Sequence, residues 1–289
     1  MVATTATPML SAGLLDGRVL LVTGGGTGLG RRIAERAASL GARLVLASRD
    51  PGHLAEAVRS IASSGGEAVA VPTDVRDHRQ TRGLVRSALE RYGRIDGLVN
   101  NAAGNFIRPA ERLPESAFAN IVDIVLNGTF NCSRAAGRAM IDSGHGGAIL
   151  NIVATYAWTG GPGTIHSACA KAGVLAMTRT LAVEWARYGI RVNGLAPGPF
   201  ESEGASSRLW PTAEMEERVR SSVPLRRFAR LDEVAEASLY LLSDHASYIT
   251  GETITLDGGA WLGRGVLSGS PSEEVPVVRR RRPPRPERG

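Results

Sequence analysis

The amino-acid sequence predicts an α/β protein with a doubly wound, Rossmann-like parallel sheet in a single domain. Short apolar segments of strand length alternate with amphipathic segments of helical length, which is the pattern of a parallel sheet covered by helices on both faces. A glycine-rich turn separates the first predicted strand from the first predicted helix. No break in composition divides residues 17–265, so one domain is expected there.

The first half of the chain contains three units of strand and helix. The apolar run RVLLVT predicts a buried first strand, and the glycines after it allow a tight turn. The first helix ends at Leu40 and Gly41, where glycine suits a C-cap. In order, we predict strand 18–23, turn 24–30, a helix to Leu40, strand 43–47, a helix near 52–63, strand 67–71 and helix 77–92.

The second half repeats the alternation with longer helices. In order, we predict strand 95–99, helix 115–142, strand 148–153, helix 165–188, strand 190–195, helix 232–242 and strand 253–257. The Pro-, Gly- and Ser-rich stretch 197–224 is predicted to be irregular. Connections of this length often cover a functional site, so we expect this stretch to be a lid.

The formal net charge of +6 does not by itself indicate a nucleic-acid-binding protein. Residues 271–289 carry six arginines and three glutamates, so they supply +3 of that charge. A Pro/Arg-rich segment cannot bury enough apolar surface to fold. We therefore expect residues 266–289 to form a disordered tail and residues 1–16 a lead-in, with no nucleic-acid partner.

The sequence also indicates the cellular compartment of the protein and whether it binds a metal. No segment is long and apolar enough to span a membrane, and the N-terminal residues lack the pattern of a signal peptide. Cys132 and Cys169 are far apart in the sequence and show no metal-ligand spacing. The prediction is a cytoplasmic protein with reduced cysteines, no metal site and no membrane partner.

The segment TGGGTGLG has the character of a phosphate-binding turn. Gly24, Gly28 and Gly30 follow the spacing G-x-x-x-G-x-G between a strand and a helix. Glycines let the backbone approach phosphates closely, and a helix N-terminus attracts anions. A dinucleotide is therefore expected, and a tight turn without a ligand is the alternative. The predicted cofactor residues here are Thr23, Gly24, Gly26, Thr27, Gly28, Leu29 and Gly30.

The end of the second strand indicates which dinucleotide is bound. An NAD site usually places a carboxylate there to bind the ribose hydroxyls. This chain instead has Ser48 and Arg49, which suit a 2′-phosphate, so we predict NADP(H). Asp74 and Val75 are predicted to lie along the adenine. Further predicted cofactor residues are Asn100, Asn101, Ala102, Ala103, Gly104, Lys171, Pro197, Gly198 and Phe200.

Lys171 is the only lysine in a chain with 33 arginines. A bias toward arginine codons explains why arginine stands in place of lysine elsewhere in the chain, but position 171 has kept an ammonium group. Lysine is a compact charge with three rotatable donors, whereas arginine is a planar fork. We therefore expect Lys171 to hydrogen-bond a sugar and to stabilise a nearby oxyanion. The alternative is that one lysine survived by chance.

Several motifs resemble the short-chain dehydrogenase/reductase family over about residues 16–263. They are TGGGTGLG, NNAAG at 100–104, the helix that contains the lysine, PGP at 197–199 and DGG at 257–259. The resemblance implies hydride transfer with a nicotinamide and usually a homotetramer. Three of the family's usual catalytic residues are missing, because Ser167 stands in place of the tyrosine, Ala154 in place of the serine and Val125 in place of the asparagine.

One branch of that family, the 2,4-dienoyl-CoA reductases, resembles the chain more closely. The shared segments are NNAAGNF at 100–106, DIVLNGT at 123–129, TYA at 155–157, SACAKAG at 167–173 and GASSRL at 204–209. In this branch the catalytic tyrosine lies fifteen residues before the lysine, which is Tyr156 here. The resemblance implies that Asn105 is its partner and that Ser167 positions Lys171 or the cofactor.

The resemblance implies NADPH-dependent reduction of a 2,4-dienoyl thioester, with fatty-acid β-oxidation as the pathway. Hydride addition at C5 moves electrons to the thioester oxygen, and protonation at C2 gives a 3-enoyl product. Tyr156 and Asn105 are expected to donate to that oxygen, since stabilising developing charge is usually the largest catalytic contribution. Tyr156 is also expected to supply the proton, with Lys171 favouring its phenolate.

Three residues are predicted to bind the substrate. In the branch, arginines that match Arg76 and Arg208 contact the acyl-CoA, and the alternative is that both are solvated surface residues. Phe106 and the lid are expected to shape the acyl pocket. Glu201 and Glu203 are unexpected near CoA. A thioester of an acyl carrier protein therefore stays open as the substrate, as does a specialised polyene.

Other interpretations of the site residues also stay open. Tyr156 is alternatively a buried aromatic, Asn105 a loop cap and Ser167 an ordinary helix residue. His166 is interpreted as a loop histidine, and Asn127 as a polar residue that bridges the backbone. For the whole chain, the alternatives are a 3-oxoacyl or ketone reductase and a non-catalytic NADP(H)-binding relative.

Overall fold

A seven-stranded sheet forms the middle layer of the structure, in the order β3-β2-β1-β4-β5-β6-β7. The computed structural model describes residues 10–201, 210 and 212–262. The strands are β1 (Val19–Thr23), β2 (Arg43–Ser48), β3 (Glu67–Pro72), β4 (Gly97–Asn100), β5 (Gly147–Ile152), β6 (Ile190–Pro197) and β7 (Thr253–Leu256). All neighbours pair in parallel, and the order reverses between β1 and β4. The predicted doubly wound sheet is therefore confirmed.

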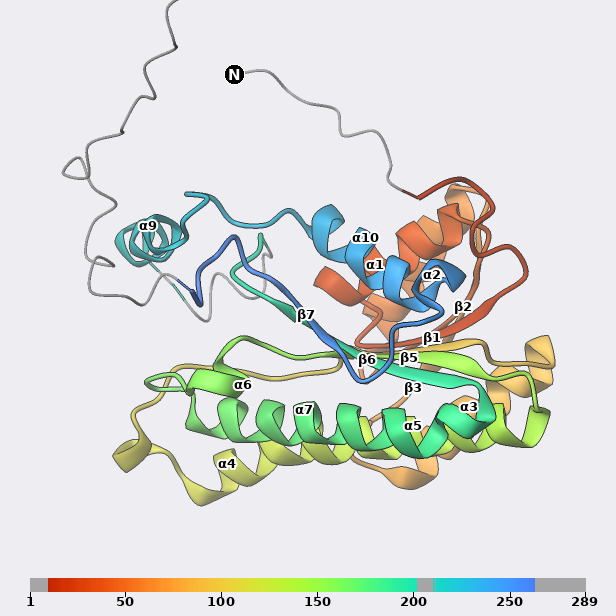
Figure 1. Ribbon diagram of the computed structural model, residues 1–289, viewed down its shortest axis with the longest axis horizontal. Coiled ribbons are helices and arrows are strands. Elements are labelled where there is room, and N and C mark those ends of the chain that lie inside the picture. The colour runs from red at the N-terminus through yellow and green to blue at the C-terminus, as the bar shows by residue number, and fades with distance from the viewer. Residues whose placement is uncertain (1–9, 202–209, 211, 263–289) are drawn as a thin grey trace, which may run out of the picture.

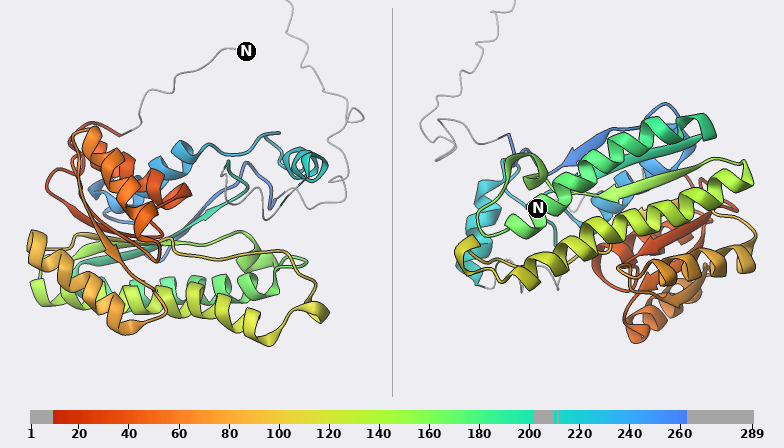
Figure 2. Two further views of the ribbon diagram at one scale, coloured as in Figure 1. Left: turned by 180° about the vertical axis from the view of Figure 1, so that it is seen from behind. Right: turned by 90° about the horizontal axis from the view of Figure 1, so that it is seen from below.

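Helices cover both faces of this sheet, so the molecule has three layers (Figure 1). One face carries α1 (Gly28–Ser39), α2 (Pro51–Ser63) and α10 (Leu231–Leu242). The other carries α3 (His78–Tyr92), α4 (Glu115–Val122), α5 (Gly128–Ser143) and α7 (Ile165–Trp185). Two further helices, α6 (Tyr156–Thr159) and α9 (Ala213–Ser222), lie at the same end of the molecule (Figures 1 and 2).

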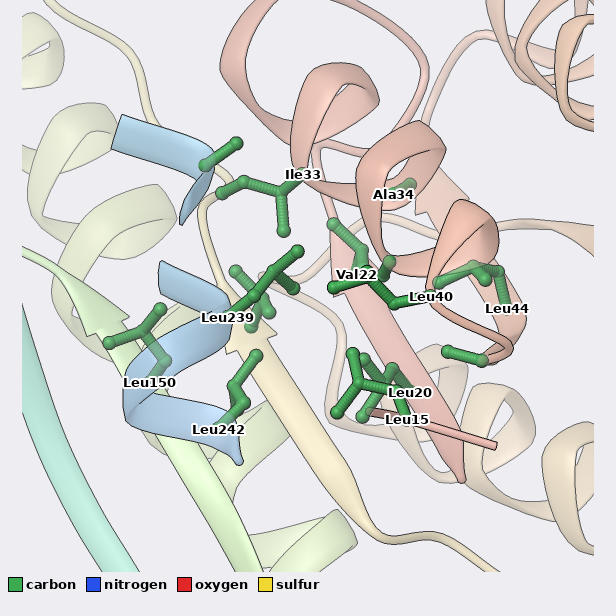
Figure 3. Close-up of a cluster of buried hydrophobic side chains, with 14 of the residues drawn as sticks. Leu15, Leu20, Val22, Ile33, Ala34, Leu40, Leu44, Leu150, Leu239 and Leu242 are labelled. Atoms are coloured by element: carbon green, nitrogen blue, oxygen red, sulfur yellow. The ribbon is translucent and has the colours of Figure 1, made fainter. Parts of the chain in front are cut away.

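The alternation of side chains along each strand divides the core between the two faces of the sheet. In β1, Leu20 and Val22 pack against α1 and α10, whereas Val19 belongs to the cluster on the opposite face. Figure 3 shows Leu20 and Val22 beside Ile33 of α1 and Leu239 of α10. Burying one such side chain completely contributes about 1.5–3 kcal/mol. These contacts therefore fix the first helix, whose N-terminus faces the site, on the sheet.

The predicted helix 115–142 and the predicted irregular stretch 197–224 both differ from the structure. The predicted helix 115–142 contains a π-helical segment, Asp123–Asn127, between α4 and α5. The prediction of an irregular stretch at 197–224 is wrong for α9, whose residues show no apolar periodicity. Instead, Thr212 caps this helix by accepting from the Met215 amide at 3.2 Å, and Arg220 pairs with Glu216 one turn earlier.

The described ranges contain neither a membrane-spanning helix nor a cluster of metal-binding side chains. None of the helices there combines the length and the apolar character that crossing a bilayer requires. Among the same residues, no group of three or more His, Cys, Asp or Glu side chains is placed to hold a metal ion. Cys132 and Cys169 are both free.

Candidate active site

A cavity of about 540 Å³ opens at the carboxyl ends of β1, β2, β3 and β4. Ligands of doubly wound sheets bind at this edge, where the strand order reverses. The predicted cofactor residues on its wall are Gly24, Gly26, Thr27, Gly28, Leu29, Ser48, Arg49, Asp74, Val75, Asn101, Ala102, Ala103, Gly104 and Phe200. Asn105, predicted as catalytic, completes this wall together with Ala47, Asp50, His53, Thr73 and Ile124. The cavity therefore extends from the phosphate-binding turn to Asn105, whereas Tyr156, Ser167 and Lys171 do not line it.

The glycine turn fits a pyrophosphate. Gly24 and Gly28 have φ values of +64° and +52°, which favour glycine. A Cβ on Gly30 would lie 2.2 Å from the carbonyl oxygen of Gly24, so no side chain can be accommodated there. The first helix begins at Gly28 on the cavity wall, and its N-terminus presents unpaired N–H groups and a partial positive charge. Side-chain-free backbone and an anion-attracting helix end together suit a dinucleotide.

Thr23 supports this turn without lying on the cavity wall. Its Oγ1 accepts hydrogen bonds from the amides of Asn101 and Ala102, both at 3.0 Å. Asn101 Nδ2 in turn donates to the carbonyl of Thr23 at 3.0 Å and to that of Gly24 at 3.3 Å. These bonds tie the loop after β1 to the loop after β4. Pro197 and Gly198 also lie off the wall, at the end of β6.

Ser48, the last residue of β2, and Arg49, in the segment after it, lie on the wall beside His53, which the sequence interpretation missed. Asp50 also lies there, but its carboxylate caps α2 by accepting from the His53 amide at 3.0 Å. His53 stands in the first turn of that helix, close to Gly26 of the phosphate-binding turn. The sequence did offer one signal for His53, because this residue follows shortly after β2, and the end of β2 sets the cofactor preference.

Arg76, predicted to bind substrate, is held by Asp74. Its guanidinium donates to both carboxylate oxygens and, through Nη1, to Asn120 Oδ1 at 2.8 Å. The bonds from Arg76, helped by the charge of Arg49, lower the pKa of Asp74 below its usual value. Arg76 does not line the cavity, so a substrate contact remains a prediction. Arg208 lies outside the described residues.

Asn105, Tyr156 and Ser167 come together from three separate segments. Asn105 Nδ2 donates to the Tyr156 hydroxyl at 3.3 Å, and that hydroxyl lies 3.0 Å from Ser167 Oγ. Asn105 Oδ1 accepts from the Phe106 amide at 2.9 Å, which turns the amide nitrogen toward the tyrosine. The tyrosine begins α6, a helix of one turn that the sequence prediction missed. Burial raises the pKa of Tyr156, and the bond to Ser167 acts in the opposite direction.

Lys171 lies in the same helix as Ser167, one turn further along. The side chain is buried, and its ammonium donates to the carbonyl of Ile152 at the end of β5. Burial lowers the pKa of Lys171 from 10.5 to about 8. The ammonium makes no hydrogen bond to Tyr156 among the described contacts, so any effect on the phenol acts through space.

The places of the usual catalytic residues are filled by buried groups. Val125 is fully buried, Ala154 is 9% exposed and Ser167 is 1% exposed. Two side chains differ from their sequence interpretation. His166 is not a loop residue but a fully buried member of α7. Asn100 does not line the cavity, because its Nδ2 bonds Ser133 and Asn151 inside the core.

Comparison with known proteins agrees with this geometry. The family model described as Enoyl-(Acyl carrier protein) reductase matches residues 24–260. A solved structure, a short-chain dehydrogenase from Bacillus anthracis, is 47% identical with a TM-score of 0.78 and covers 85% of this chain and 97% of its own. The chain belongs to the short-chain dehydrogenase/reductase family. It is therefore an oxidoreductase, and members of this family use a nicotinamide cofactor, NAD(P)(H).

Curated relatives within this family confirm the resemblance to the dienoyl-CoA reductase branch. A protein of Bacillus subtilis is 45% identical over 249 residues, covering 86% of this chain and 98% of that one. It is named a probable 2,4-dienoyl-CoA reductase that produces (2E)-enoyl-CoA. A peroxisomal 2,4-dienoyl-CoA reductase of Pongo abelii is 44% identical over 251 residues, covering 86% of this chain and 85% of its own, and its name specifies a (3E)-enoyl-CoA product.

Proposed function

We propose that this oxidoreductase is an NADPH-dependent 2,4-dienoyl thioester reductase. The observation that carries the proposal is the hydrogen-bonded set of Asn105, Tyr156 and Ser167. A ketoreductase of this family would need its tyrosine four residues before Lys171, where this chain has Ser167. The hydroxyl of Tyr156 reaches the same cluster from α6 instead. A non-catalytic protein would have no use for two donors arranged in this way.

The residues of the site divide the work between charge stabilisation and proton transfer. A bound nicotinamide would supply a hydride to C5 of the dienoyl chain. The Tyr156 hydroxyl and the Asn105 amide then donate to the thioester oxygen, where negative charge develops. Tyr156 gives its proton to C2, and a 3-enoyl thioester results. Lys171 lowers the cost of the resulting phenolate through its positive charge, and it would bind the ribose of a nicotinamide cofactor.

The preference for NADP(H) is part of the proposal and rests on Arg49 and Ser48. Both line the cavity after β2, and Asp50 is engaged in capping a helix rather than free to bind ribose hydroxyls. An Arg guanidinium matches the geometry of a phosphate. We expect NADPH to bind more tightly than NADH, and Arg49→Ala to weaken NADPH binding about 10-fold while leaving NADH binding nearly unchanged. Equal losses for both cofactors in a fluorescence titration would contradict this assignment.

The acyl carrier is proposed to be CoA, within fatty-acid β-oxidation. The curated relatives are named for CoA thioesters, whereas the description of the family model names an acyl carrier protein. Arg76 is the described residue proposed to contact the carrier. Comparing one dienoyl chain on CoA and on an acyl carrier protein by kcat/KM distinguishes the two.

The decisive experiment follows NADPH oxidation by absorbance, with trans-2,trans-4-hexadienoyl-CoA and acetoacetyl-CoA in parallel. Oxidation with the dienoyl thioester alone supports the proposal. Oxidation with acetoacetyl-CoA alone means a ketoreductase with a different acid. The proposal also fails if both substrates are inert while NADPH still binds. Product analysis then separates protonation at C2, which gives the 3-enoyl thioester, from protonation at C4, which gives the 2-enoyl thioester.

A further inference from the structure

His166 is a buried polar side chain that the proposed mechanism does not use. It stands in the first turn of α7, next to Ser167, and is fully buried. Among the described residues, neither ring nitrogen makes a hydrogen bond of good geometry, and the Phe106 backbone acts only as a weak partner. Buried polar groups are nearly always paired, and an unpaired one calls for an explanation.

The imidazole of His166 stacks on the ring of Phe106. The ring centroids lie 4.3 Å apart with an interplanar angle of 19°. Offset stacks of this kind contribute about 0.5–1.5 kcal/mol beyond the buried area. Burial lowers the pKa of His166 below 6.5, while the Phe106 backbone opposes that shift. A neutral ring is therefore packed against Phe106 at neutral pH.

Phe106 is the residue that orients Asn105. Its amide donates to Asn105 Oδ1 at 2.9 Å, and this bond leaves Asn105 Nδ2 to donate to Tyr156. The next part of the loop is fixed as well, because the Arg108 amide donates to the carbonyl of Gly163 at 2.8 Å. The loop that carries Asn105 is thus tied on one side of Phe106 to Tyr156 of α6 and on the other side to Gly163, just before α7.

We propose that His166 is a positioning residue that sets the distance between the two oxyanion donors. Its ring clamps Phe106 against α7, and Phe106 in turn holds the Asn105 amide toward Tyr156. The proposal rests on the proposed function, because Asn105 and Tyr156 must act on the substrate for their spacing to affect turnover. It adds a group that acts through Phe106 rather than on the substrate itself.

Two substitutions distinguish a role of the aromatic ring of His166 from a role of its nitrogen atoms. His166→Phe keeps an aromatic ring against Phe106, and we expect its kcat to stay within about three-fold of the wild type. His166→Ala removes the ring, and we expect kcat to fall about 10- to 100-fold with little change in the Kd for NADPH, since small misplacements of catalytic groups are costly. Met140→Ala, a buried substitution in α5 remote from the site, controls for general destabilisation. Equal losses in both His166 variants, or an unchanged kcat in His166→Ala, would overturn the proposal.

A double-mutant cycle tests whether His166 acts through Asn105. If it does, His166→Ala should cost little further activity once Asn105→Ala is present. Fully additive losses would mean that His166 has an independent role, and the proposal would be wrong.

Hydrogen exchange makes the test independent of the proposed function. The Phe106 amide reports directly on its bond to Asn105. We expect it to exchange at least 10-fold faster in His166→Ala than in the wild type, and at a near wild-type rate in His166→Phe. Unchanged exchange in His166→Ala would refute the clamp even if no dienoyl substrate were turned over. Inactivity of the wild-type enzyme, by contrast, would refute the function and leave this measurement interpretable.

Discussion

Burial acts on Tyr156 and Lys171 in opposite directions. Removing a phenol from water raises its pKa, whereas removing an ammonium lowers it, because the charged form is disfavoured in both cases. Tyr156 is therefore held as the neutral acid that a proton donor must be. Lys171 remains largely protonated near pH 7, since its lowered pKa of about 8 is still above that value. The site thus combines a neutral donor with a buried charge.

Removing the Tyr156 hydroxyl should abolish most of the proposed activity. Tyr156→Phe deletes both an oxyanion donor and the proposed acid, so we expect kcat to fall roughly 100- to 1,000-fold. The Kd for NADPH should change little, because Tyr156 does not line the cofactor cavity. Steady-state kinetics with hexadienoyl-CoA provides the measurement. Retention of full activity would show that another group donates the proton.

Lys171 should make stability depend on pH in the cofactor-free protein. Between pH 8 and 10 the unfolded chain keeps the lysine proton while the folded protein loses it, so stability rises with pH. Relative to Lys171→Met, the free energy of unfolding of the wild type should rise by on the order of 3 kcal/mol as the pH increases from about 8 to 10.5, the pKa values of Lys171 in the folded and unfolded states. Most of this increase should be present by pH 10. Urea unfolding of both proteins at several pH values measures the difference, and Tyr156, present in both, cancels. Parallel curves would mean that the pKa of Lys171 is not lowered.

At the scale of elements, two local departures from regular structure shape the cavity. The glycine turn brings the start of α1 to the wall, with Gly30 tight against the Gly24 carbonyl. The π-helical segment places Ile124 on the wall and Val125 in the core. Single-turn π segments are frequent at functional sites. After that segment, Gly128 lets the backbone approach Val75, another wall residue.

A methyl group at Gly30 should damage the turn, whereas one on an exposed helix should not. In Gly30→Ala the new Cβ would lie 2.2 Å from a backbone oxygen, which cannot move aside cheaply. We expect NADPH affinity to fall at least about 10-fold and stability to fall by more than about 1 kcal/mol. Gly83→Ala in α3, where no atom lies within 4 Å of the new Cβ, is the matched control. It should stabilise the protein by about 0.5–1 kcal/mol, as thermal unfolding will report.

At the scale of the whole molecule, contacts between distant segments complete the fold. Arg32 and Arg36 of α1 pair with Asp232 and Glu236 of α10, so that segments 200 residues apart in the sequence support the same face. On the opposite face, the long helices α5 and α7 form the outer surface (Figure 2). Val183 in α7 is 81% exposed and Phe130 in α5 is 47% exposed. We propose that this surface is covered in a homotetramer.

Charging this surface should change the oligomeric state. We expect the wild type to sediment as a tetramer, and Val183→Glu to yield smaller species, because a carboxylate cannot be buried without a partner. Leu89→Glu on α3, an apolar position on another helix that is 37% exposed, should leave the tetramer intact. A wild-type monomer in sedimentation velocity would refute the proposal.

The sequence alone determined the layered fold and the glycine-rich turn after the first strand, and it singled out Lys171. These features depend on local patterns, since apolar alternation, glycine spacing and a single lysine can be recognised without coordinates. Asn105 and Tyr156 were predicted as partners from the resemblance to a family, and the structure places their side chains 3.3 Å apart. The helical content of 213–222 could not be predicted in this way, because ion pairs along the helix rather than an apolar face support it.

Only the tertiary structure decided how the site residues divide their roles. Thr23, Gly30 and Asn100 belong to the predicted cofactor motifs, but packing turns them toward neighbouring backbone or the core and not toward the cavity. His166 is also turned inward by tertiary packing. It stacks on Phe106, which lies in a loop 60 residues earlier in the chain. Burial and pKa depend on which segments meet in space, and local sequence carries little information about that meeting.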